Sequence, residues 1–132
     1  MIALVFTLPL KVTGATAGNS REHPMAKHRR VKAQRGAVGW AWLCAGLHLK
    51  PMRLPLIVTL TRVAPRPLDS HDNLRSGLKP AVDELAARLG LKSDADPRVE
   101  WRYQQERGGV RVYAVRVSIE PASSGVRPAG AM

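Results

Sequence analysis

The chain has 132 residues and a formal net charge of +11 at neutral pH. This length allows one domain with a real core and excludes two. A hydrophobic fraction of 45% excludes a wholly disordered chain, and the basic excess favours a polyanionic partner, with nucleic acid first and an anionic membrane surface second.

The first expected element is a buried β-strand over Ile2–Leu8, which is rich in branched and aromatic residues. No positive charge precedes this apolar run, and the run is too short for a signal peptide or a membrane-spanning helix. A loop over 11–20 follows. We therefore expect a cytoplasmic protein that does not enter the membrane, and a single cysteine, Cys44, suits that compartment. Its apolar neighbours predict a buried, inert thiol.

The next segment, Met25–Leu49, is compatible with a helix. Its apolar stripe would consist of Val31, Val38, Trp42 and Ala45. Its first half carries five basic residues, for which we expect contact with DNA phosphates, the alternative being a solvated helix face: Lys27, Arg29, Arg30, Lys32 and Arg35. We expect Trp40 and Trp42 in the core or in a dimer contact rather than as base-stacking platforms.

A second strand is predicted over Leu56–Val63, and a second helix follows over about Asn73–Leu89. The buried stripe of this helix would consist of Leu74, Leu78, Val82, Leu85 and Leu89. Pro80 predicts a kink within it. Helical spacing puts Asp72, Lys79 and Asp83 on one face.

Two further strands are predicted over Val99–Gln105 and Val110–Ile119, with a turn over 106–109 between them. From Pro121 onwards, small residues, proline and glycine predict a disordered tail, so that residues 1–120 form one domain and 121–132 the tail. The order β, α, β, α, β, β predicts an α/β (α+β) fold, with a small mixed sheet of about four strands and two helices packed on it.

All five aspartates of this basic chain fall between Pro67 and Val99, at Asp69, Asp72, Asp83, Asp94 and Asp96. They come from a strand end, a helix start and a later loop. Carboxylates gathered in this way are typical ligands of Mg²⁺. The structural alternative is that Asp69 and Asp72 only cap the helix and compensate its dipole.

Four short motifs follow one another in this part of the chain, namely Asp72-Asn73-Leu74, Lys79, Val82-Asp83-Glu84-Leu85 and Asp94-Ala95-Asp96-Pro97-Arg98-Val99. Together they resemble the RusA-type Holliday junction resolvases, which are phage-associated endonucleases. Asn19, Arg21 and His23 also resemble the N-terminal segment of that family. The resemblance implies a homodimer that cleaves four-way or other branched DNA with Mg²⁺. It also implies metal ligation by Asp72 and Asp96, joined by Asp69, and a catalytic or phosphate-contacting role for Lys79.

This chain departs from the family pattern at Ser70, where the family has its first aspartate, and in the three extra residues before Lys79. Two alternatives therefore stand beside the endonuclease. One is a relative that binds DNA but whose acidic site has decayed. The other is a small phage structural or partner-binding protein, which would lack the salt-sensitive DNA affinity of the first two.

Overall fold

The computed structural model describes residues 4–12, 24–50, 52–68 and 71–122, without the side chains of His71 and Asp72. The elements follow in the order β1 (Leu4–Leu8), α1 (Pro24–Cys44), a short 3-10 helix η2 (Leu47–Leu49), β2 (Leu56–Ala64), α2 (His71–Arg88), β3 (Val99–Arg107) and β4 (Ala114–Pro121). The predicted order of strands and helices is confirmed. Asn19, Arg21, His23, Asp69 and Ser70, like residues 123–132 of the expected tail, lie outside the described residues.

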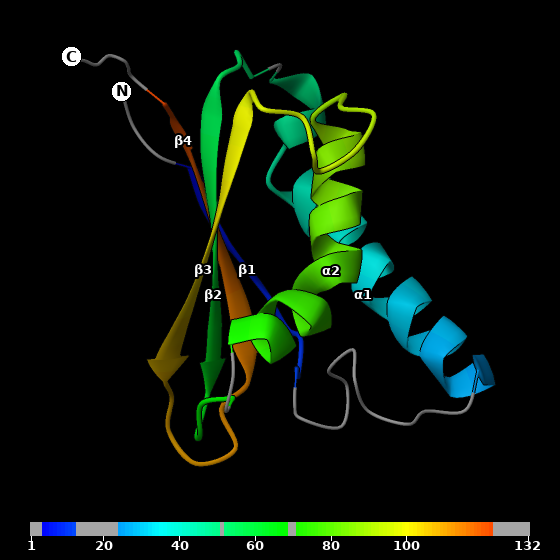
Figure 1. Ribbon diagram of the computed structural model, residues 1–132, viewed down its shortest axis with the longest axis vertical. Helices are drawn as coiled ribbons and strands as arrows, with labels where there is room; N and C mark the ends of the chain where they lie inside the picture. Colours follow the sequence, from blue (N-terminus) through cyan, green and yellow to red (C-terminus); the bar gives the residue numbers. More distant parts are fainter. Residues whose placement is uncertain (1–3, 13–23, 51, 69–70, 123–132) are drawn as a thin grey trace.

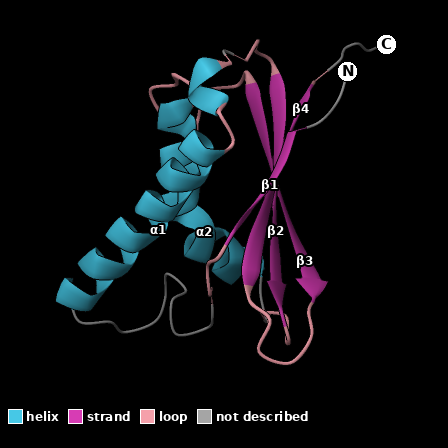
Figure 2. Ribbon diagram, turned by 180° about the vertical axis from the view of Figure 1, so that it is seen from behind, coloured by secondary structure: helices cyan, strands magenta, loops and turns pink. Residues whose placement is uncertain are grey.

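The four strands form one mixed sheet in the order β1-β4-β2-β3. β4 is antiparallel to both of its neighbours, whereas β2 and β3 are parallel, with Leu56 opposite Val99 and Ala64 opposite Arg107. Parallel strands start at the same edge of a sheet, so α2 has to carry the chain back along the sheet between them. Both helices pack on one face, which gives the two layers in Figures 1 and 2.

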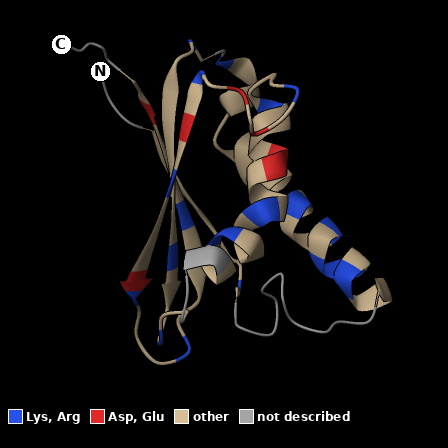
Figure 3. Cartoon of the chain, in the orientation of Figure 1, with Lys and Arg blue, Asp and Glu red and all other residues tan. Residues whose placement is uncertain are grey.

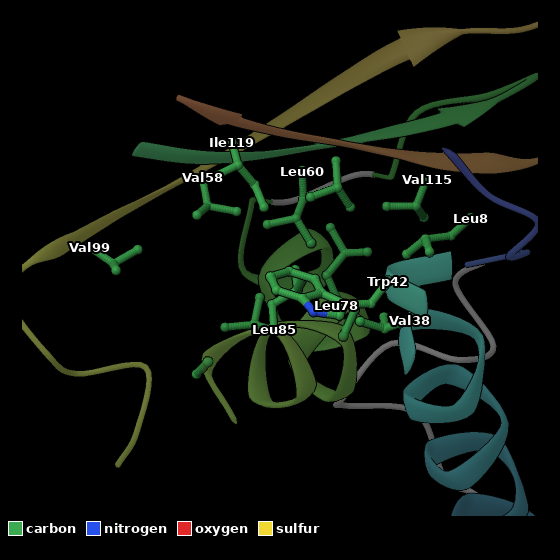
Figure 4. Close-up of a cluster of buried hydrophobic side chains, with 14 of the residues drawn as sticks. Leu8, Val38, Trp42, Val58, Leu60, Leu78, Leu85, Val99, Val115 and Ile119 are labelled. Carbon is green, nitrogen blue, oxygen red and sulfur yellow. The ribbon is translucent and has the colours of Figure 1, made fainter. Parts of the chain in front are cut away.

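The core lies between the sheet and the helices, as Figure 4 shows. Alternate residues of β2 and β4 point towards the helices, as expected for pleated strands. The stripe predicted on α2 is buried from Leu74 to Leu85, and Leu89 is half-buried. In the stripe predicted on α1, Val38 and Trp42 are buried, Val31 is half-buried, and Ala45 is exposed.

Three predictions made around the ends of α1 and β4 were wrong. α1 ends at Cys44 instead of Leu49, because Gly46 takes a left-handed conformation with φ of 71° and stops the helix. Cys44 is therefore on the last, solvent-facing turn and is exposed, not buried. β4 begins at Ala114 instead of Val110, because the preceding loop runs through Arg111, which also has a left-handed φ of 60°.

Helix α2 remains continuous through Pro80 but changes direction in its first half, as predicted (Figure 1). Proline has no N–H to donate and crowds the carbonyl one turn earlier. The buried side chain of Gln34, from α1, compensates at this point. Its Oε1 accepts the N–H of Ala81 at 2.8 Å, and its Nε2 donates to the carbonyl of Gly77 at 3.2 Å.

In an unbroken helix, the N–H of Ala81 and the carbonyl of Gly77 would pair with each other. The Gln34 amide is thus inserted into the hydrogen-bond ladder of α2, which is a recognised cause of helix bending. The same contact fixes where α1 crosses α2, and it brings the basic half of α1 beside the first half of α2. Among the described residues, no helix is long and apolar enough to span a bilayer.

Candidate functional site

A pocket of about 620 Å³ lies where α1 and α2 approach each other above β3. Four cationic side chains line it, namely Lys27 and Arg30 of α1 and Arg75 and Lys79 of α2. Figure 3 shows basic positions on both helices in the region where α1 and α2 approach each other. The lining also includes Asp83, Asp94 and Tyr103. The positive charges outnumber the carboxylates, so the pocket suits an anion.

Lys79 holds the two carboxylates of this pocket together. Its Nζ lies 3.1 Å from Oδ1 of Asp83, one turn along α2, and 2.8 Å from Oδ2 of Asp94, in the loop before β3. The hydrogen bond to Asp94 is the largest cause that raises the pKa of Lys79, and the one to Asp83 also raises it, whereas burial acts in the opposite direction. Lys79 is therefore an ammonium ion at neutral pH and can supply charge, but it is not a proton acceptor.

The loop before β3 brings Asp94 to this position. The indole Nε1 of Trp101 donates to the main-chain carbonyl of Asp94 at 2.9 Å, so the loop folds over the first residues of β3. The N–H of Ala95 donates to the hydroxyl of Ser93 at 3.2 Å and closes the turn. Both contacts hold the Asp94 carboxylate towards α2.

Asp96 faces a different partner. Its carboxylate accepts two bonds from the guanidinium of Arg98, at 3.0 and 2.8 Å, and a third from the N–H of Arg98 at 2.9 Å. The side-chain bonds from Arg98 lower the pKa of Asp96 to about 2. Of the two aspartates in this loop, the structure thus brings Asp94 to Lys79, whereas the sequence analysis had singled out Asp96. The carboxylates are two residues apart in a turn, and the sequence pattern does not indicate which one faces α2.

An aromatic side chain, that of Tyr103, also lines the pocket. The guanidinium carbon of Arg75 lies 5.7 Å from the ring centre of Tyr103, within the range of a cation–π contact. Burial raises the pKa of the Tyr103 hydroxyl, and the charge of Arg75 partly offsets this. Neither residue was predicted from the sequence, although Arg75 lies four residues before Lys79 and this spacing places the two on one helix face.

The five basic residues predicted on α1 divide between two sides of the helix. Lys27 and Arg30 line the pocket, and Arg29 is exposed to solvent. Lys32 and Arg35 line a separate groove, in which Nε of Arg35 binds the Glu84 carboxylate at 3.0 Å. Four of the five predicted DNA-binding residues are therefore distributed over two neighbouring hollows that share Val31, and contact of the five with DNA stays a prediction.

The carboxylates of the predicted metal site are next to basic side chains wherever the structure describes them. In the described part of the chain, no group of three or more His, Cys, Asp or Glu side chains could hold a metal ion. Asp83, Asp94 and Asp96 each pair with a basic side chain, so these carboxylates alone do not fit a Mg²⁺ site. The backbone of Asp72 lies in the first turn of α2, two turns before Lys79, and its side chain, like Asp69, lies outside the described residues.

No protein-family model matches the chain, and no curated protein matches it in sequence.

Proposed function

We propose that the protein is a DNA endonuclease of the RusA type that cleaves four-way junctions or other branched DNA. The observation that carries this proposal is the pocket between α1, α2 and β3, where Lys27, Arg30 and Arg75 line the same space as the Asp83–Lys79–Asp94 cluster. A polyanion is the ligand that such a pocket favours. The resemblance of the segment from Asp72 to Val99 to the junction resolvases supplies the reaction class.

The residues of the pocket suit the handling of a phosphodiester. Lys27, Arg30 and Arg75 can each contact phosphate oxygens, and the face of Tyr103 next to Arg75 offers a surface on which a sugar or base can pack. Lys79, with its raised pKa, keeps a positive charge beside negative charge that develops on the phosphate. The pairing with Asp83 and Asp94 fixes the position of that charge before the substrate arrives.

The cofactor and the assembly belong to the same proposal. We propose Mg²⁺ with Asp69 and Asp72 as ligands, because carboxylate oxygens are the kind that it prefers. Asp96, the third ligand that the resemblance implies, would have to exchange its bonds with Arg98 for the ion. Symmetric cleavage of a junction requires two sites related by a two-fold axis, so we propose a homodimer. We place the activity in the cytoplasm, where branched DNA and a reduced Cys44 would be found together.

A second candidate function is DNA binding without cleavage. It is favoured by the pairing of Asp83, Asp94 and Asp96 with basic side chains, which leaves fewer carboxylates for a metal, and by Ser70 in place of the family aspartate. A partner-binding phage protein without affinity for DNA stays the third alternative.

A pair of assays on the same variants separates these functions. Binding of a labelled junction is measured by fluorescence anisotropy over a range of salt concentrations, and cleavage is measured with Mg²⁺ and with EDTA. The variants are Arg75→Gln and Lys79→Gln, with Arg53→Gln as control, since Arg53 is exposed and does not line the pocket. The logarithm of the association constant falls linearly with the logarithm of the salt concentration, and each pocket substitution should make this slope less steep by about 0.9.

The nuclease is supported if the pocket variants lose binding while Arg53→Gln keeps it, and if the unchanged protein cleaves the junction with Mg²⁺ but not with EDTA. Salt-sensitive binding without cleavage supports the second candidate. If the unchanged protein shows no salt-sensitive binding, both are refuted.

A further inference from the structure

We propose that the edge of the sheet where β2 and β3 end is a second DNA-contact surface, separate from the pocket. This inference rests on the proposed function and extends it to the part of the DNA beyond the pocket. We call this surface the basic edge and define it by Lys11, Arg66, Arg107 and Arg111. Figure 3 shows basic positions on the loops at this end of the sheet.

The topology brings these residues together from three separate segments. Arg107 is the last residue of β3 and lies opposite Ala64, two residues before Arg66. Arg111 lies in the loop that leads to β4. The first residue of β4, Ala114, lies opposite Val63 of β2, so this loop is at the same end of the sheet. Nζ of Lys11 lies 4.6 Å from the ring centre of Tyr113, at the end of the same loop.

A buried arginine holds two of these segments in place. Arg62, only 4% exposed, donates from Nε to the carbonyl of Val12 at 2.6 Å and from Nη1 to the carbonyl of Arg66 at 2.8 Å. Its third acceptor is Oε1 of Gln105 at 3.1 Å. Burial lowers the pKa of Arg62, because the buried guanidinium loses its hydration, and the three acceptor oxygens offset that loss. The main chain beside Lys11 and Arg66 is thereby fixed.

The charge of the basic edge is not neutralised within the described part of the chain. Many of the other basic side chains, such as Arg35, Lys79, Arg98 and Arg116, are in salt bridges. The four members of the basic edge are exposed, and none of them forms a salt bridge with a described residue. The nearby carboxylate of Glu106 is bound by Arg116 through two hydrogen bonds.

The basic edge continues a line that starts in the pocket. Along one face of β3, Tyr103 lines the pocket, Gln105 accepts the N–H of Leu68 at 2.8 Å just before α2, and Arg107 ends the strand. Four residues of a strand span about 13 Å, so the pocket and the basic edge are about 13 Å apart. Along the axis of a DNA duplex, this distance corresponds to roughly four base-pair steps at about 3.4 Å each. In the sequence, Asp69 and Asp72 lie between Arg66 of the basic edge and Arg75 of the pocket.

DNA fits this surface better than a membrane does. The loop before β4 also exposes Val110 and Val112, at 86% and 47%, and a basic loop with apolar residues can insert into an anionic bilayer. Two valines on a loop offer far less apolar area than the amphipathic helices that bind membranes stably. Continuity with the pocket favours DNA.

The test compares double variants of equal charge change. Arg107→Gln with Arg111→Gln removes two charges from one side of the basic edge, and Lys11→Gln with Arg66→Gln removes two from the other. The control, Lys50→Gln with Arg53→Gln, removes two exposed charges before β2 begins, at the opposite end of the sheet. Circular dichroism and the melting temperature establish that each variant folds.

Binding is measured on a 20-base-pair duplex over a range of salt concentrations, and on vesicles with 30% phosphatidylserine. Each edge variant should bind DNA about tenfold more weakly at low salt, with the salt slope reduced by about 2. The control should keep the slope of the unchanged protein. Unchanged slopes in both edge variants would overturn the inference, as would a loss of vesicle binding with DNA binding intact. If the pocket variant Lys79→Gln weakens binding while both edge variants do not, the inference fails and the proposed function stands. If the unchanged protein shows no salt-sensitive binding, both fail.

Discussion

The amide of Gln34 should be among the largest single side-chain contributions to stability in this fold, because it serves two main-chain groups of α2 at once. Replacing it by methionine keeps the length of the side chain and removes both hydrogen bonds. The N–H of Ala81 and the carbonyl of Gly77 then lose their partners in a buried setting. Each unsatisfied group costs about 1–3 kcal/mol.

The two groups can recover part of that cost by pairing with each other, but this requires α2 to straighten against the ring of Pro80. We therefore expect Gln34→Met to lower the free energy of unfolding by about 2–4 kcal/mol. The measurement is urea unfolding followed by far-ultraviolet circular dichroism. Gln104→Met is the matched control, since Gln104 is exposed on β3 and its amide accepts a long contact of 3.5 Å from the Thr61 hydroxyl. It should stay within about 0.5 kcal/mol.

A third variant, Gln34→Glu, separates the two bonds. A carboxylate can still accept from Ala81, but it cannot donate to Gly77, and its burial raises its pKa. Stability of this variant should be highest at acid pH, where the carboxyl is protonated, and should fall as pH rises through that raised pKa. A loss of less than about 0.5 kcal/mol in Gln34→Met would refute the role assigned to Gln34.

Three further predictions concern charge and exposure. Glu84→Gln should destabilise the contact between α1 and α2 by about 1 kcal/mol, because the 16%-exposed carboxylate binds an arginine from each helix. The loss should be smaller at high salt. Urea unfolding at low and high salt measures it, and an equal loss of free energy at both would contradict the prediction. The pKa of Asp96 in the folded protein, at about 2, lies below its value of 3.8 in the unfolded chain, so its contribution to stability is present above pH 3.8 and is lost as pH falls towards 2. Carbon-detected NMR titration should show this carboxyl ionised at pH 3, and Arg98→Gln should return its pKa towards 3.8. Exposed Cys44 should react with a thiol reagent in the folded protein as readily as in urea, and protection in the folded state would contradict the position given to the end of α1.

Much of the fold could be predicted from the sequence. The alternation in β4 and the stripe from Leu74 to Leu85 are periodic, and periodicity identifies both the type of element and its buried face. α1 has no such clear stripe, since basic residues, glycines and tryptophans share its surface. Its end was therefore placed too late, and Cys44 was assigned to the core.

Less of the candidate site could be predicted. Helical spacing correctly placed Lys79 and Asp83 on one face, because a spacing of four is a local property of α2. The approach of Asp94 depends on a loop held by Trp101, and the sequence does not encode such a contact in any regular pattern. Gln34 and Arg62 were missed for a related reason. Both are buried polar groups that bind main-chain groups far away in the sequence, and those partners are known only once the chain has folded.

The most direct test of the proposed function is cleavage of a labelled four-way junction by the unchanged protein and by Asp72→Asn, each with Mg²⁺ and with EDTA. We expect symmetric nicks that require Mg²⁺ and that disappear in Asp72→Asn, while junction binding by the variant is retained. Cleavage that persists in EDTA, or equal cleavage by the two proteins, would contradict the proposed site. Salt-sensitive binding without any cleavage would contradict the nuclease and leave a DNA-binding protein.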